Sequence, residues 1–125
     1  MHSEKRRRSI LKSNEDVSVS LKEAMLHVPS HQKTQVAAKF QALFELYLEG
    51  HEWRVPSQFN LEGIIAKNTQ LYALKVKQVR CYGWYDSASF VISHYTFKKQ
   101  QKLSKADVHR AERNFSLWVK ERSQK

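Results

Sequence analysis

The fold of this chain is decided by residues 71–97, which read LYALKVKQVRCYGWYDSASFVISHYTF. Apolar and polar residues alternate along most of this stretch, and a period of two is typical of half-buried β-strands. We predict strands over 71–77, 79–85 and 89–97, because a tight turn follows the first and Asp86-Ser87-Ala88 has turn-forming chemistry. Strands joined by such short turns favour an antiparallel meander.

A short helix is predicted well before the meander. Ser20 and Glu23 have the spacing of a capping box, in which two side chains satisfy free backbone donors at a helix start. The helix should run to about Val28, since Pro29 cannot donate a hydrogen bond within a helix. A short strand is also predicted over residues 8–12, within a basic N-terminal arm.

A second, longer helix is predicted to follow Ser30, which can cap it. Its apolar residues recur at spacings of three and four: Val36, Phe40, Leu43 and Tyr47. Gly50 suits the end of this helix because glycine accepts the left-handed conformation found there. Residues 51–70 are rich in turn-forming residues, so we predict a connecting loop.

A last helix is predicted after the meander. Ser104 and Asp107 form a weaker capping box, because aspartate replaces glutamate. One face of the helix is apolar and the other is basic: Val108, Ala111, Phe115 and Trp118 against Arg110, Arg113 and Lys120. The expected fold is therefore α+β, with a helical hairpin on one face of a small twisted antiparallel sheet and a C-terminal helix. Residues 1–12 form the basic arm and residues 13–125 a single domain.

The charge of the chain points to a polyanionic partner. The 125 residues include 22 Lys and Arg against 12 Asp and Glu, a net charge of +10. Residues 70–125 alone hold twelve basic and four acidic residues, net +8. Charge segregated in this way favours a binding face over uniform solubility charge. No apolar run is long enough to span a membrane, so we expect no membrane partner and a cytoplasmic location.

The sequence predicts no cofactor and no metal site. The three glycines are isolated, so no phosphate-binding glycine loop is present. Cys81 is the only cysteine, and the histidines lack the spacing of a zinc site. Because Cys81 alternates with Arg80 and Tyr82, it should pack in the core.

A cluster of cations marks the candidate site on the three strands and just beyond them. Its members are Lys75, Lys77, Arg80, Lys98, Lys99 and Lys102, with Tyr82, Trp84, His94, Tyr95 and Phe97 interleaved. Cations bind phosphates, and aromatic rings stack on bases. Such residues permit RNA cleavage by attack of a 2′-hydroxyl on the adjacent phosphorus. Lys or Arg would stabilise the developing charge, and His94 titrates near neutral pH.

The same residues carry a family resemblance. Leu71–Lys77, Val79–Tyr85 and Phe90–Lys102, with the run Lys98-Lys99-Gln100-Gln101-Lys102, resemble the RelE/ParE toxin superfamily and its phage-derived, HigB-like branch. The resemblance covers about residues 60–122. It implies a type II toxin–antitoxin toxin that cuts mRNA on the ribosome without metal. It also implies a cognate antitoxin, expected to be a helix-turn-helix protein.

The resemblance assigns roles by position. Arg80, His94 and Lys98 are the expected catalytic residues: Arg80 and Lys98 would clamp a phosphate, and His94 or a lysine would transfer protons. The expected RNA-binding residues are Lys75, Lys77, Tyr82, Lys99 and Lys102, with Tyr82 stacking on a base. Arg80 and Tyr82 share one face by alternation, as do His94 and Lys98. Whether both pairs lie on the same side of the sheet stays open.

Two alternatives remain. Many members carry an acidic residue and an arginine where this chain has Ala73 and Lys75, and lysine lacks the bidentate fork of arginine. A catalytically inactive, phage-derived nucleic-acid-binding module is therefore one alternative. The other is a ParE-like inhibitor of DNA gyrase, because one fold supports several functions.

Overall fold

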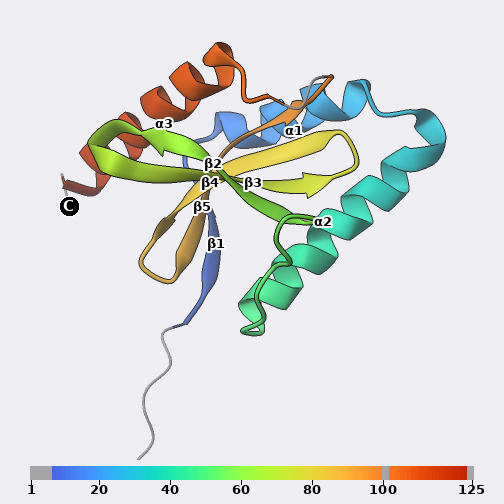
Figure 1. The fold of residues 1–125 in the computed structure, drawn as a ribbon, viewed down its shortest axis with the longest axis horizontal. Coiled ribbons are helices and arrows are strands. Elements are labelled where there is room, and N and C mark those ends of the chain that lie inside the picture. Colours follow the sequence, from blue (N-terminus) through green and yellow to red (C-terminus); the bar gives the residue numbers. More distant parts are fainter. Residues whose placement is uncertain (1–6, 100–101, 124–125) are drawn as a thin grey trace, which may run out of the picture.

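The computed structural model describes residues 7–99 and 102–123 as an α+β fold, which confirms the predicted class (Figure 1). The order of elements is β1 (Ser9–Lys12), α1 (Asp16–Leu26), α2 (Lys33–Leu48), β2 (Phe59–Ile65), β3 (Thr69–Val76), β4 (Val79–Asp86), β5 (Ser89–Phe97) and α3 (Lys105–Ser123). Short 3-10 turns at Ser30–Gln32 and Ala66–Asn68 precede α2 and β3. The predicted meander is therefore β3, β4 and β5.

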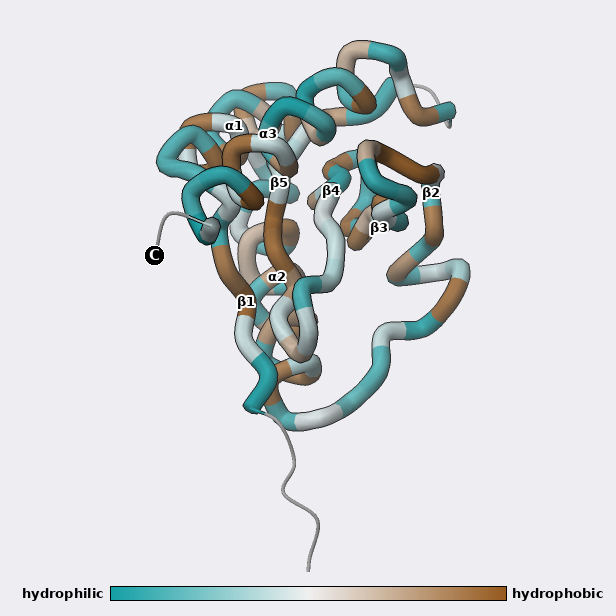
Figure 2. Tube along the Cα trace, turned by 90° about the vertical axis from the view of Figure 1, so that its left-hand side faces the viewer, coloured by the Kyte–Doolittle hydropathy of each residue, from teal (hydrophilic) through white to brown (hydrophobic). Residues whose placement is uncertain are grey.

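The five strands form one mixed sheet in the order β1-β5-β4-β3-β2 (Figure 2). The meander is antiparallel, as predicted, but β1 pairs with β5 in parallel, with Ser9 opposite Ser89. The expectation of a wholly antiparallel sheet is thus wrong. The short strand predicted in the basic arm is confirmed, and it forms one edge of the main sheet. Lys5 and Arg6 of the arm lie outside the described residues.

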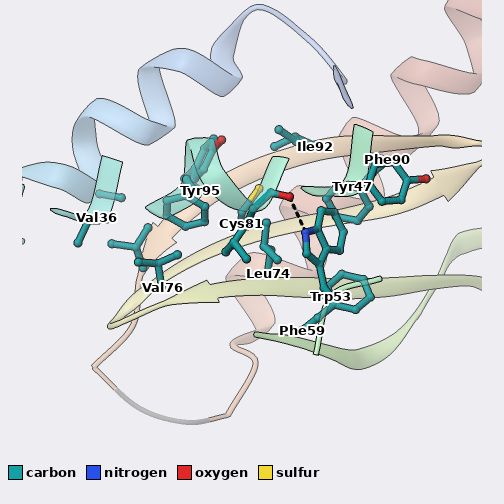
Figure 3. Packing of buried hydrophobic residues seen from close by; sticks show 14 of the residues in the cluster. Val36, Tyr47, Trp53, Phe59, Leu74, Val76, Cys81, Phe90, Ile92 and Tyr95 are labelled. Atoms are coloured by element: carbon teal, nitrogen blue, oxygen red, sulfur yellow. Dashed lines mark hydrogen bonds between the residues drawn. The ribbon is translucent and has the colours of Figure 1, made fainter. Parts of the chain in front are cut away.

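The helical hairpin covers one face of the sheet, and α3 crosses part of the other (Figure 1). The core under α1 and α2 combines aliphatic and aromatic side chains, and Trp53 donates a hydrogen bond to the carbonyl of Leu43 at 2.8 Å within it (Figure 3). Cys81 is fully buried there, as predicted. A smaller core lies beneath α3 around Tyr82 and Trp84. The second face of the sheet is therefore partly covered by α3.

The capping box predicted at Ser20 is wrong, because α1 begins four residues earlier at Asp16. The Asn14 side chain accepts the Asp16 N–H at 2.7 Å, which favours this earlier start. Ser20 is buried within the helix. Its hydroxyl donates to the Val17 carbonyl at 2.6 Å and accepts the Tyr95 N–H at 2.9 Å, so it ties α1 to β5.

The segment predicted as a loop, residues 51–70, contains the edge strand β2. Its polar and glycine residues are tolerated because β2 has a partner on one side only, and the pairing shifts register between Leu61 and Gly63. The end of α2 follows the prediction, since Gly50 has a φ of 100°. Its start differs: α2 begins at Lys33 after a 3-10 turn, with no side-chain cap.

Candidate nucleic-acid interface

The pleat of the sheet places Arg80 and Lys98 on the same face. Arg80 lies opposite Lys75 on β3 and opposite Thr96 on β5, and opposite residues of paired strands share a face. Lys98 is two residues beyond Thr96 and contacts Asp107 of α3. The face shared by these cations is therefore the one that α3 crosses, which settles the alternative that the sequence left open.

Arg80 is half-buried beside the turn that joins β3 and β4. One of its terminal nitrogens donates to the carbonyls of Lys77 at 2.7 Å and Val79 at 3.4 Å. Among residues 7–99 and 102–123, no carboxylate forms an ion pair with this guanidinium. Its charge is therefore available to a ligand, and its remaining N–H groups suit the oxygens of a phosphate.

The flanking lysines lie close to Arg80 but differ in how tightly they are held. The ammonium of Lys75 donates to the side-chain oxygen of Asn60 at 3.1 Å, in the amide orientation in which the Asn60 nitrogen also donates to the Phe59 carbonyl. Lys77 is exposed in the turn, at a φ of 51°, and Lys99 is exposed just after β5. We call Lys75, Lys77, Arg80 and Lys99 the hairpin-end cations. Their common location supports the predicted grouping of Lys75, Lys77 and Lys99 with Arg80.

Lys98 is buried instead of presented to solvent, with 9% of its surface exposed. Its ammonium donates to the backbone carbonyl of Lys102 and lies 3.8 Å from the Asp107 carboxylate. One contact comes from the segment that leads into α3, and the other comes from the first turn of α3. In this arrangement Lys98 anchors that segment to the sheet, so its ammonium is already partnered. The expectation of a free clamp at this position is wrong.

His94 is also buried, with 1% exposed, and both ring nitrogens are hydrogen-bonded. Nδ1 lies 2.8 Å from the Ser93 hydroxyl and Nε2 lies 2.9 Å from the Asp107 carboxylate. Burial lowers the pKa of His94, and this effect outweighs the opposing influence of Asp107. The ring is therefore neutral at pH 7, with Nε2–H donating to Asp107. Its enclosure does not fit the exposed proton-transfer group that the sequence predicted.

Asp107 joins these buried groups at the start of α3. Its backbone N–H donates to the Ser104 hydroxyl at 3.0 Å, and that hydroxyl donates to the Asp107 carboxylate at 2.8 Å, which confirms the predicted cap. Burial acts to raise the pKa of Asp107, but the hydrogen bonds from His94 and Ser104, aided by the charge of Lys98, lower it overall. A carboxylate is thus kept ionised at the centre of the cluster.

Residues that the sequence reasoning missed complete this polar cluster. Asn114 of α3 donates to the Ser93 carbonyl at 2.9 Å, and Ser13 donates to the same carbonyl at 3.3 Å. A signal for them existed, because Asp107 and Asn114 lie seven residues apart and flank Ala111 on the buried side of α3. Polar residues on such a stripe indicate a buried hydrogen-bonded network.

Tyr82 lies beneath α3 with none of its surface exposed. The prediction that it stacks on a base is wrong for this arrangement, because no face of its ring is accessible. Its hydroxyl has no hydrogen-bond partner among the described residues. Burial raises the pKa of Tyr82, so the phenol is neutral. Its ring centroid lies 5.2 Å from that of His94, which adds it to the packing around the polar cluster.

An open pocket of about 490 Å³ lies beside this cluster. Lys98, Lys99 and Lys102 line it, together with the rings of His27 and Phe97. Those two rings lie 5.5 Å apart between centroids, at an interplanar angle of 33°. His27, at the end of α1, was not singled out from the sequence because only the fold brings it to β5. The pocket thus supplies the exposed aromatic surface that was expected at Tyr82.

Within residues 7–99 and 102–123, no three His, Cys, Asp or Glu side chains gather as a metal-binding group. No helix over the same residues is long and apolar enough to cross a membrane. No protein-family model matches the chain, and no curated protein matches it significantly.

Proposed function

We propose that this protein is an RNA-binding toxin that cuts mRNA on the ribosome. The observation that carries the proposal is the placement of Arg80, which lies directly opposite Lys75 and has no carboxylate partner among the described residues. Cations left without carboxylates on one surface favour a phosphate-rich ligand. The proposed location is the cytoplasm, where ribosomes work, and the proposed inhibitor is an antitoxin.

The chemistry follows from the charge on this surface. The 2′-oxygen of a ribose attacks the adjacent phosphorus, the new P–O bond forms, and the bond to the 5′-oxygen breaks. The 2′-hydroxyl proton passes to a base, and the departing 5′-oxygen takes up a proton. Arg80 would stabilise the charge that develops on the phosphate oxygens. Because His94 is enclosed, a lysine takes the proton-transfer role in this proposal, and Lys75 lies directly opposite Arg80.

A second candidate is a nucleic-acid-binding module without catalysis. The burial of His94 and Lys98 favours it, because both side chains are fully engaged with Asp107 and its neighbours. A module of this kind needs only the hairpin-end cations. Its affinity for RNA would fall steeply with salt, since counterions are released when cations meet phosphates.

The deciding experiment is induction of the protein alone, followed by mapping of mRNA ends. New ends that vanish in Arg80→Ala but persist in the control Lys22→Ala, an exposed lysine of α1, would support the nuclease. Intact mRNA with salt-sensitive RNA binding, lost in Arg80→Ala, would support the second candidate. Absence of RNA binding in the unaltered protein would refute both, and a block of DNA supercoiling would then favour gyrase inhibition.

A further inference from the structure

A second pocket, of about 550 Å³, lies beside the β3–β4 turn. It lies among α2, the segment after Trp53 and the C-terminal end of β3. The longer polar side chains of its lining come from these three parts of the chain: Gln35, Lys39, Arg54, Gln58, Lys75 and Lys77. Lys75 and Lys77 belong to the cation cluster expected from the sequence, whereas Lys39 and Arg54 do not, so this pocket extends that cluster.

Four cations and no carboxylate line this pocket. None of the four forms an ion pair among residues 7–99 and 102–123, although ion pairs elsewhere in those ranges neutralise Arg8 and Arg122. Like charges that share a pocket lie within about a Debye length, roughly 10 Å at 0.1 M salt, and therefore repel one another. An anion that contacts several of them relieves this repulsion.

The wall of the pocket is held by backbone hydrogen bonds. The Gln58 side chain accepts the Arg54 N–H at 3.0 Å, and the Gln58 N–H donates to the Arg54 carbonyl at 2.8 Å. Lys75 N–H donates to the Gln58 carbonyl at 2.8 Å. The Cα atoms of Arg54 and Lys75 are thus fixed relative to each other, which reduces the ordering cost of binding a ligand between them.

The chemistry of the lining favours a phosphate group. The guanidinium of Arg54 offers a planar fork for two oxygens, and lysine ammoniums serve as point charges for the others. Lys75 and Lys77 line this pocket and also belong to the hairpin-end cations beside Arg80. A phosphodiester chain bound at Arg80 therefore meets a continuous run of cations as it passes the turn.

We propose that the pocket formed by Lys39, Arg54, Lys75 and Lys77 is a second phosphate-binding position for a single-stranded RNA. The inference rests on the proposed function in one respect, that the same strand also contacts Arg80. The pocket holds a backbone phosphate away from the reacting one, so it contributes to affinity and to the direction of the strand. Because phosphate contacts carry no base information, this position is insensitive to sequence.

The test is RNA affinity as a function of salt, measured by fluorescence anisotropy with a labelled uridine dodecamer. The test variant combines Lys39→Gln with Arg54→Gln, and both side chains are exposed, so the fold should persist. The control variant combines Lys22→Gln with Lys120→Gln, which removes the same charge from exposed positions on α1 and α3. Thermal unfolding of all variants verifies that each is folded.

We expect the test variant to reduce the slope of log affinity against log salt by about 1.4. Each phosphate contact to a single strand releases about 0.7 counterion, and the variant removes two such contacts. Affinity at low salt should fall about tenfold, and the control should change neither quantity by half as much. Equal effects in both variants would overturn the inference, while the proposed function would stand if Arg80→Ala still weakens binding. If RNA affinity falls in the test variant but not in Arg80→Ala, the pocket binds RNA and the proposed function is refuted.

Discussion

Asp107→Asn removes the charge that holds the buried polar cluster together, with little change in side-chain shape. Asp107 is 8% exposed and accepts hydrogen bonds from His94 at 2.9 Å and from Ser104 at 2.8 Å. Its carboxylate also faces the buried ammonium of Lys98 at 3.8 Å. The substitution turns two charge-assisted hydrogen bonds into neutral ones and leaves this ammonium without a counter-charge.

The size of the expected loss in stability follows from these contacts. A hydrogen bond to a charged group contributes about 1.5–3 kcal/mol, against about 1 kcal/mol for a neutral one. Breaking a buried ion pair by removing one partner costs about 3–5 kcal/mol. Lys98 keeps its bond to the Lys102 carbonyl, and the new amide can still cap α3, so the loss stays below the sum of these values. We expect the free energy of unfolding to fall by about 2–4 kcal/mol.

Urea unfolding at neutral pH measures this loss. Glu121→Gln is the control, because Glu121 lies on the same helix, is exposed, and should change stability by less than about 0.5 kcal/mol. A double-mutant cycle with His94→Gln should give a coupling free energy above about 0.5 kcal/mol, as expected for two residues in contact. If Asp107→Asn is as stable as the control, Asp107 does not organise this cluster.

Other predictions concern the same face of the sheet. The free energy of unfolding should decrease as pH falls. Because the pKa of His94 is lower in the folded chain than its usual 6.5, the unfolded chain protonates this imidazole first, and stability begins to fall below pH 6.5. The pKa of Asp107 is also lowered by folding, so the stability that its carboxylate contributes is lost only below its usual 3.8. Urea midpoints measured against pH check this decrease, whose upper part should disappear in His94→Gln. Tyr82→Phe should raise the free energy of unfolding by about 1 kcal/mol, because it deletes a buried hydroxyl without a partner; a loss of stability would show that the hydroxyl is bonded. Gly83→Ala should cost at least about 2 kcal/mol in urea unfolding, since its Cβ would lie 2.5 Å from a backbone oxygen of β5, whereas Gly63→Ala, with its nearest contact at 3.7 Å, should change stability by less than about 1 kcal/mol.

Local patterns in the sequence determined the central elements of this protein. Alternation along residues 71–97 predicts β3, β4 and β5, because a strand shows its two faces to different surroundings residue by residue. The cap at Ser104 and the end of α2 at Gly50 are equally local, since each depends on hydrogen bonds or torsions within a few residues. The inward orientation of Cys81 follows from the same alternation.

Features that depend on distant partners were not available from these patterns. Phe59–Ile65 becomes a strand because β3 offers it an edge, and Ser20 lies inside a helix because its hydroxyl bonds to the backbone of β5. The parallel pairing of β1 likewise joins segments about eighty residues apart. In the first two cases a long-range contact outweighs a local preference, and in the third it selects the partner and direction of a strand.

The candidate site shows the same division. Composition and alternation determined that cations gather at the end of the meander and that Arg80 shares a face with Tyr82. Only the tertiary structure decided which of these side chains a ligand can reach, because α3 packs across that face. It covers Tyr82, ties His94 and Lys98 to Asp107, and leaves Arg80 without a carboxylate partner among the described residues. Accessibility depends on which distant element covers a strand, and no spacing within the strand records that choice.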